Sequence, residues 1–387
     1  MAVVNKIYNR QTNSHRSQWL LNLLFVILLI ISSRYVIGGP KDSLQQDSLK
    51  HIKITAYPAV GYSPETSLSF GVVGFLVVNP RNQVKNAEYH RPSSISPYFL
   101  YTLNNQFLSA IDFEFYPGSK INVNTTIRLF NYPDFYYGIG NETPDIYETY
   151  TDKFFKWNWD VSYVIYPNLF IGLAFNWQIN QISDLDPDGR LVQNNINGIE
   201  GGSILGIGPL LRYDSRNNIF YPDKGIFFEF KSLFYPNAFG NDYQYQNFSI
   251  DFRSFHHVFS KKNILAFQVY YDHVNGRSIP FYKLPRLGGD SRLRGINNEN
   301  RYRDNHAYYL QVEGRRELFW RLGGVIFAGV GNVNNRLSDF EFNSLKYVFG
   351  IGGRFRPFKN EKLNLRLDIG KGPGDQYAIY LAVKEAF

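Results

Sequence analysis

The residues best suited to chemistry gather between Leu284 and Leu318. A glycine-rich stretch there carries Arg292-Leu293-Arg294-Gly295, and a run of alternating apolar and polar residues follows it. Guanidinium and carboxylate groups form charge-assisted hydrogen bonds, so the chemistry on offer is ionic pairing. The apolar face of the run is Tyr308, Leu310 and Val312, and its polar face is Gln311, Glu313, Arg315 and Glu317.

Alternation with a period of two predicts a β-strand that is apolar on one side and charged on the other. A strand of a membrane β-barrel needs this arrangement, because lipid covers its outer face and a polar lumen its inner face. A loop rich in Gly, Arg and Asn that joins such a strand indicates a loop folded back into the lumen. We therefore expect a transmembrane β-barrel with Arg294 anchored inside it.

A second segment resembles a metal ligand set. Asp184, Asp186 and Asp188 copy the first half of a calcium-binding loop. Position twelve of that loop is Asn195 instead of a bidentate Glu, and Pro187 restricts the turn. An acidic surface loop is the default interpretation, and a weak calcium site is the alternative.

No enzyme signature stands in a usable context. The seven His are scattered, and His273 and His306 flank the arginine-rich loop without a well-placed Ser. An outer-membrane phospholipase would need a Ser, a His and an orienting group that converge. We therefore predict that the protein is not an enzyme and uses no cofactor.

Composition limits the class of protein. The 387 residues include no Cys, which excludes disulfides and thiol chemistry. Aromatic residues make up 17% of the chain, an enrichment that suits strands and the aromatic girdles of barrels. The formal charge is +8; residues 1–38 hold four basic residues and no acid, so the remainder carries 8 − 4 = +4. That balance, without a basic run, argues against a nucleic-acid partner.

The chain begins with a candidate leader. Residues 1–18 are polar and basic, Trp19 to Ile31 is apolar except for Asn22, and small residues follow. This layout predicts a signal peptide over residues 1–38, with a signal anchor as the alternative. Residues 39–51 are interpreted as a linker, and the barrel domain is expected over residues 52–387.

Sixteen alternating segments are predicted as strands, an even number of the kind bacterial barrels use. If the N-terminus of the barrel is periplasmic, the long connections face outward and the short turns face the periplasm, apart from a long turn at 80–95. A soluble all-β sandwich or propeller is the alternative. The predicted strands are 52–62, 66–79, 96–104, 106–116, 120–131, 151–166, 169–181, 202–213, 225–235, 243–257, 263–274, 306–318, 322–332, 345–356, 362–370 and 376–387.

Three features together resemble one family, the bacterial surface antigens or BamA/TamA-type outer-membrane assembly barrels. Arg294-Gly295-Ile296 is similar to the Arg-Gly-aromatic motif of that family's sixth extracellular loop, and falls between predicted strands eleven and twelve. Residues 212–225 resemble its strand-turn-strand signature. The final strand resembles the signal by which such barrels are recognised for insertion, carried here by Tyr377, Ile379, Leu381, Val383 and Phe387.

The resemblance implies partners for the arginine of this loop. Arg294 would lie in the lumen and pair with acids on strands twelve and thirteen, and Glu313 fits the first acid. Gly329 stands where the family usually has the second, which predicts a weakened anchor with Asp368 or a carbonyl as substitute partner.

The resemblance also implies function. The leading hypothesis is outer-membrane protein insertion, translocation or envelope biogenesis in a Gram-negative bacterium. Residues 39–51 are too few for a POTRA domain, so a separate periplasmic or outer-membrane protein partner is expected beside lipids and lipopolysaccharide. A passive channel or structural barrel is the second hypothesis, and a lipid esterase or its accessory is the third.

Overall fold

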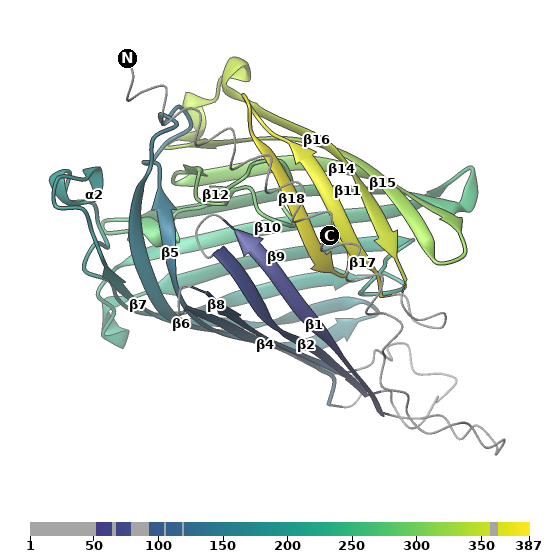
Figure 1. Cartoon of the computed structure of the whole chain (residues 1–387). Coiled ribbons are helices and arrows are strands. Elements are labelled where there is room, and N and C mark those ends of the chain that lie inside the picture. Colours follow the sequence, from purple (N-terminus) through teal and green to yellow (C-terminus); the bar gives the residue numbers. More distant parts are fainter. Residues whose placement is uncertain (1–51, 64–66, 79–92, 104–105, 118–119, 357–362) are drawn as a thin grey trace, which may run out of the picture. The chain divides into compact units, whose positions relative to one another are not determined.

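The computed structural model of the chain describes residues 52–63, 67–78, 93–103, 106–117, 120–356 and 363–387. These residues form an almost entirely β unit with a curved sheet of sixteen strands, as predicted (Figure 1). The predicted signal peptide and linker lie outside the described residues, as does most of the turn expected at 80–95. No helix among the described residues is long and apolar enough to cross a bilayer.

The strands pair antiparallel in chain order, except that β12 and β13 form a separate two-stranded sheet. Ladders run from β1 to β18, and none joins β18 to β1 in the part of the chain that is described. The strands are β1 (Ile52–Ser63), β2 (Ser67–Val78), β3 (Ser93–Thr102), β4 (Phe107–Phe115), β5 (Ile121–Tyr136), β6 (Glu148–Tyr166), β7 (Leu169–Ser183), β8 (Gly202–Asp214), β9 (Gly225–Tyr235), β10 (Tyr245–Val258), β11 (Ser260–Gly276), β12 (Arg286–Leu287), β13 (Tyr302–Arg303), β14 (His306–Phe319), β15 (Leu322–Asn334), β16 (Lys346–Phe355), β17 (Leu365–Lys371) and β18 (Tyr377–Val383).

The short helices all lie in connections. They are α2 (Arg190–Gln193) and the 3-10 helices η2 (Asn237–Phe239), η3 (Phe281–Lys283), η4 (Leu337–Asp339) and η5 (Phe342–Ser344). The connections after β5, β7, β9, β11 and β15 leave one end of the strands, which we call the loop end. The short turns after β6, β10 and β14 and the longer connection after β8 leave the other, which we call the turn end.

Polar residues face the inside of this sheet and apolar residues face outward. On β7, Asn176 and Gln178 are buried, whereas Leu173 is 48% exposed. The same alternation buries Gln311 on β14 and leaves Leu310 exposed. This inside-out distribution is that of a transmembrane β-barrel, with a lipid-facing outer surface and a polar lumen.

Predicted strand ends differ from the structure at β5, β6 and β18. β5 continues to Tyr136 and β6 begins at Glu148, so the loop expected at 132–150 is shorter. The extension buries Tyr136 and Tyr150 against Phe281. The last strand ends at Val383 instead of Phe387, because Lys384 adopts a left-handed backbone conformation, with φ of 72°, that a strand cannot continue through.

Loop six, residues 277–305 between β11 and β14, contains η3, β12 and β13. Its apolar side chains pack on inward-facing residues of the barrel wall and are fully buried. The cluster consists of Leu287, Leu293, Ile296 and Tyr302 from the loop and of Ala307, Tyr309, Val333 and Val348 from β14, β15 and β16. This apolar cluster positions loop six against the barrel wall. The polar residues of the loop are then placed to contact the polar side chains that line the lumen.

Candidate functional site: the lumenal anchor

Arg294 of loop six pairs with two carboxylates of the barrel wall. Its Nη1 lies 2.5 Å from Asp368 Oδ2, and its Nη2 donates to Glu313 Oε2. The guanidinium also stacks on Phe327, with Cζ 3.9 Å from the ring centroid. Burial alone would lower the pKa of Arg294, but the two carboxylates outweigh it and raise that pKa. We call Arg294, Glu313 and Asp368 the lumenal anchor.

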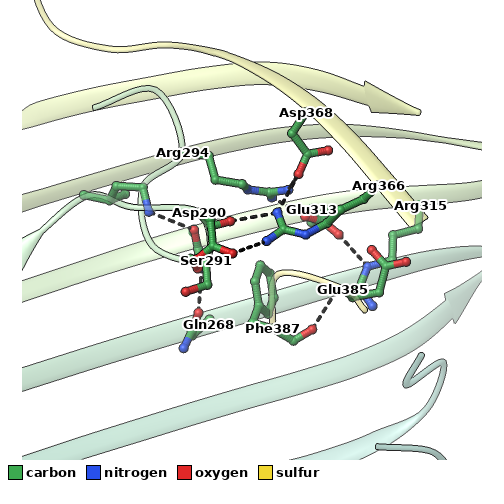
Figure 2. Close-up of polar contacts among 12 residues, drawn as sticks. Gln268, Asp290, Ser291, Arg294, Glu313, Arg315, Arg366, Asp368, Glu385 and Phe387 are labelled. Carbon is green, nitrogen blue, oxygen red and sulfur yellow. Dashed lines mark hydrogen bonds and ion pairs between the residues drawn. The ribbon is translucent and has the colours of Figure 1, made fainter. Parts of the chain in front are cut away.

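The two carboxylates of the anchor are shared with further arginines (Figure 2). Glu313 accepts a hydrogen bond from Arg315 Nε at 2.6 Å. Asp368 accepts from Arg354 Nη1 at 2.6 Å and from Arg366 Nη1 at 2.9 Å. All five side chains are at most 4% exposed. Because an isolated buried charge is costly, this mutual compensation allows the cluster to exist in the lumen.

The anchor joins strands that are not neighbours. Glu313 lies on β14 and Asp368 on β17, with β15 and β16 between them. β16 makes room with Gly352, since a Cβ there would fall on the Asp368 carboxylate. A single loop residue therefore links β14 to β17 across the two strands between them.

Gly295 and Ile296 hold the loop against β17 and β18. Gly295 has a φ of +136°, and a Cβ on it would lie 2.6 Å from the Lys371 carbonyl oxygen, so only glycine fits. Its N–H donates to the Tyr380 hydroxyl at 3.2 Å, and that hydroxyl donates to the Ile296 carbonyl at 2.9 Å. Ile296 is fully buried in the apolar cluster of loop six.

Gly329 supplies no acid to the anchor, and of the two substitute partners predicted for Arg294 the structure has Asp368. Asp368 supplies a second carboxylate, so Arg294 has two acidic partners. Gly329 instead makes room for Leu293, whose Cδ2 would lie 2.6 Å from a Cβ at that position. The glycine therefore belongs to the packing of loop six.

Other parts of loop six contact other strands. Asn300 donates to Asp134 on β5 at 2.5 Å. Lys283 donates to Asn176 at 3.2 Å and to Gln178 at 3.1 Å, both on β7. Burial lowers the pKa of Lys283 to about 8, and nearby Arg286 acts in the same direction. With the anchor on β14 and β17, the loop touches the wall at β5, β7, β14 and β17.

Comparison with known proteins decides the family. The Omp85 superfamily domain matches residues 93–356, well over half of the chain. The chain belongs to the Omp85 superfamily. Members of this superfamily are β-barrels of the outer membrane of Gram-negative bacteria. No curated protein matches the sequence significantly.

Solved Omp85-type structures share the fold at low identity. BamA from Haemophilus ducreyi lacking POTRA domains 1-3 has a TM-score of 0.57 at 12% identity, covering 86% of this chain and 70% of that one. CdiB from Acinetobacter baumannii has a TM-score of 0.55 at 11% identity, and the match covers 87% of this chain and 60% of that one. CdiB from Escherichia coli has a TM-score of 0.53 at 13% identity, and the match covers 86% of this chain and 62% of that one. This Omp85 chain thus spans less than two thirds of either CdiB.

The final strand and the residues after it point to opposite faces of the Omp85 barrel. Tyr377, Ile379 and Leu381 of β18 are exposed, and their role as an insertion signal stays a prediction. Phe387 is only 4% exposed and packs in the lumen with Phe255. Phe387 therefore does not share the outward face of Tyr377, Ile379 and Leu381.

The calcium candidate does not assemble. Asp186 caps its own turn by accepting from the Asp188 N–H at 3.0 Å, and Asp184 accepts from Ser183. Among the described residues, no group of three or more His, Asp or Glu side chains could hold a metal ion. His273 and His306 stack with ring centroids 3.9 Å apart, and His306 bonds the Tyr271 hydroxyl.

Several residues of the cluster were not singled out from the sequence. Arg366 bonds Asp290 of loop six at 2.9 Å, and Arg354 bonds Glu385 at 2.7 Å. The alternation of predicted strand 362–370 already placed Arg366 and Asp368 on the lumenal face. That pattern does not give the position of these residues along the barrel axis. This position decides which charged side chains come within bonding distance.

Proposed function

We propose that this Omp85 barrel inserts or translocates polypeptides at the outer membrane together with a separate periplasmic partner. The observation that carries the proposal is the buried attachment of loop six to β14 and β17 through Arg294. A loop held this firmly keeps those strands in one arrangement around a polar lumen. We assign the surface that receives a client chain to that partner.

A passive channel is the competing function. A polar lumen favours it, but loop six contacts the wall at β5 and β7 as well as at β14 and β17. A loop that contacts several parts of the wall argues against a wide, open pore.

We further propose that the protein is not an enzyme. His273 bonds Asn305 and His306 bonds Tyr271, and neither forms a nucleophile–base pair with a serine.

Planar-bilayer recording separates the two functions. We expect low, brief conductance for the wild-type chain and a large, steady conductance after deletion of the loop-six segment 288–301. A large, steady wild-type conductance would instead establish a channel. The exposed-site variant Arg277→Gln serves as control for effects of changing loop charge.

Depletion in the host tests the insertion role directly. We expect loss of the chain to lower the amount of heat-modifiable outer-membrane barrels or of exported protein, and Arg294→Ala to reproduce part of that loss. Affinity purification from native envelopes should then recover a periplasmic partner. Unchanged envelope protein composition after full depletion would contradict the proposal.

A further inference from the structure

A cavity of about 270 Å³ opens at the turn end of β14, β15 and β16. Its lining is strongly basic, with Glu317 as the one acid against six basic side chains. We call it the basic cavity. The basic residues are Lys262, Arg315, Arg316, Arg321, Arg354 and Arg356.

The cavity keeps hydrogen-bond donors that the described residues do not satisfy. Arg354 is 4% exposed, and its buried Nη2 has no hydrogen-bond partner there; the Glu313 carboxylate is 3.9 Å away. Arg356 donates from Nη2 to Glu317 at 3.0 Å, while its buried Nε has no acceptor. Buried donors of this kind call for an acceptor, and an anionic group satisfies both the donors and the charge.

An apolar lip borders the basic cavity. Leu318, Phe319 and Trp320, which also line it, are 51%, 68% and 76% exposed. We call these three residues the aromatic lip. The lip continues onto the outward apolar face of β15, where Leu322 and Ile326 are exposed. The site is therefore basic on its inner side and apolar on its membrane side.

The tip of the lip is held in an unfavourable backbone conformation. Trp320 has a φ of 52°, in the left-handed region that bulky residues rarely adopt. Phe259, at the tip of the β10–β11 turn, has a φ of 62° and is fully exposed. In the β6–β7 turn the equivalent conformation falls on Asn168, a residue type suited to it. Exposed aromatic residues in strained positions indicate a role for the side chain.

We propose that the basic cavity and the aromatic lip bind an anionic phospholipid of the periplasmic leaflet. The phosphodiester would accept hydrogen bonds from the guanidinium groups, whose planar donor pairs match phosphate oxygens. The acyl chains would lie along the lip and the outward face of β15. Short turns of outer-membrane barrels face the periplasm, which places the site at that leaflet. The proposal is independent of the insertion function.

Native mass spectrometry of the full chain tests the site. Protein extracted from bilayers with equal phosphatidylglycerol and phosphatidylcholine should retain phosphatidylglycerol at least threefold over phosphatidylcholine. The double variant Arg316→Gln/Arg356→Gln should abolish that preference, whereas Arg277→Gln, an exposed charge change at the loop end, should preserve it. Equal retention of the two lipids by the wild type, or an unchanged preference in the double variant, would overturn the proposal.

Competition with inorganic phosphate and with glycerophosphoglycerol, which has the headgroup but no chains, separates a lipid site from a free-phosphate site. Neither should displace the lipid at millimolar concentration. Displacement by either would show that the acyl chains contribute nothing and would refute the lipid assignment. Capture of a periplasmic protein that competes with phosphatidylglycerol would refute it equally.

Trp320→Asn provides a variant that should fold. Asn suits the left-handed position, so the melting temperature should be unchanged or higher, while phosphatidylglycerol retention falls at least threefold. A structural role for the tryptophan predicts the reverse pattern, a lower melting temperature with unchanged lipid retention.

Discussion

Arg315 donates a hydrogen bond from Nη2 to the backbone carbonyl oxygen of Phe387 at 2.9 Å. The same guanidinium faces the Phe387 ring, with Cζ 5.5 Å from its centroid, and Nε bonds Glu313 of the lumenal anchor. The segment after β18 is thereby linked to the anchor through one arginine (Figure 2). Phe387 therefore belongs to the folded lumen, on the face opposite to the exposed side chains of β18.

The first prediction is that Phe387→Ser lowers the stability of the assembled barrel. The substitution removes the ring from its contacts with Phe255 and Ala266. Truncation of a buried Phe costs about 3–5 kcal/mol. The measurement is the temperature at which the folded, fast-migrating gel form is lost, compared with wild type.

The outward variant Ile379→Ser is the matched control for Phe387. Ile379 is 38% exposed on the lipid face of β18. If the final residue acts only as an insertion signal, Phe387→Ser will reduce the amount of barrel without changing the melting temperature of what assembles. That pattern would contradict the lumenal role.

The second prediction concerns the lumenal anchor. Arg294→Ala leaves Glu313 and Asp368 with one guanidinium fewer in a buried setting, and breaking a buried pair costs about 3–5 kcal/mol. We expect loop six to become sensitive to protease, as measured by digestion of the intact barrel. Arg277→Ala, at an exposed site of the same loop, should leave the digestion pattern unchanged.

A double-mutant cycle tests whether Arg294 and Glu313 act together. Arg294→Ala already removes their interaction. The double variant with Glu313→Gln should therefore lose less free energy of unfolding than the sum of the losses in the two single variants. Strictly additive effects on the free energy of unfolding would show that the contact contributes nothing. Gln is used at position 313 because its amide oxygen can still accept the hydrogen bond that Arg315 Nε donates to Glu313.

The alternating pattern was sufficient to predict the sixteen strands and their faces, including the inward direction of Glu313. Those features depend on side-chain period, which the sequence carries directly. The choice of Asp368 as the second acid depends on the relative height of β14 and β17. Strand period alone carries no such information, so the sequence could name Asp368 only as one of two substitute partners.

One wrong strand end and one incomplete interpretation have their causes in backbone conformation and close packing. Lysine is not a residue type that favours the left-handed conformation that Lys384 adopts. No signal in the sequence therefore indicated that β18 ends at Val383. Gly329 was interpreted as a missing acid because its chemistry was compared with the family motif. The structure shows that space for Leu293 is what the position provides.

The third prediction is that Gly329→Asp destabilises loop six. A Cβ at this position lies 2.6 Å from Leu293 Cδ2, so the loop must shift before a new carboxylate can approach Arg294. Overpacking of this kind costs about 1–3 kcal/mol. We expect greater protease sensitivity of the loop, and partial recovery in Gly329→Asp combined with Leu293→Ala. Tighter loop attachment in the single variant would refute the packing explanation.

The fourth prediction is a pH dependence that originates at Lys283. Its pKa in the folded barrel is about 8, below the ordinary value of 10.5, because the ammonium group is buried and faces Arg286, while Asp272 acts in the opposite direction. A base whose pKa is lowered by folding binds fewer protons when folded, so stability rises with pH across this window. The contribution is fully present above pH 10.5 and is lost as the pH falls through 8.

Loop-six attachment should therefore strengthen between pH 7.5 and pH 10 in the wild type, measured as slower protease cleavage with a protease whose own rate is calibrated at each pH. Lys283→Met keeps the aliphatic stem and cannot titrate. It should remove the part of the pH dependence that Lys283 contributes, leaving other titrating groups unchanged. An identical pH profile in the wild type and in Lys283→Met would show that burial does not shift the pKa of Lys283 and that its contacts with Asn176 and Gln178 do not couple to the charge.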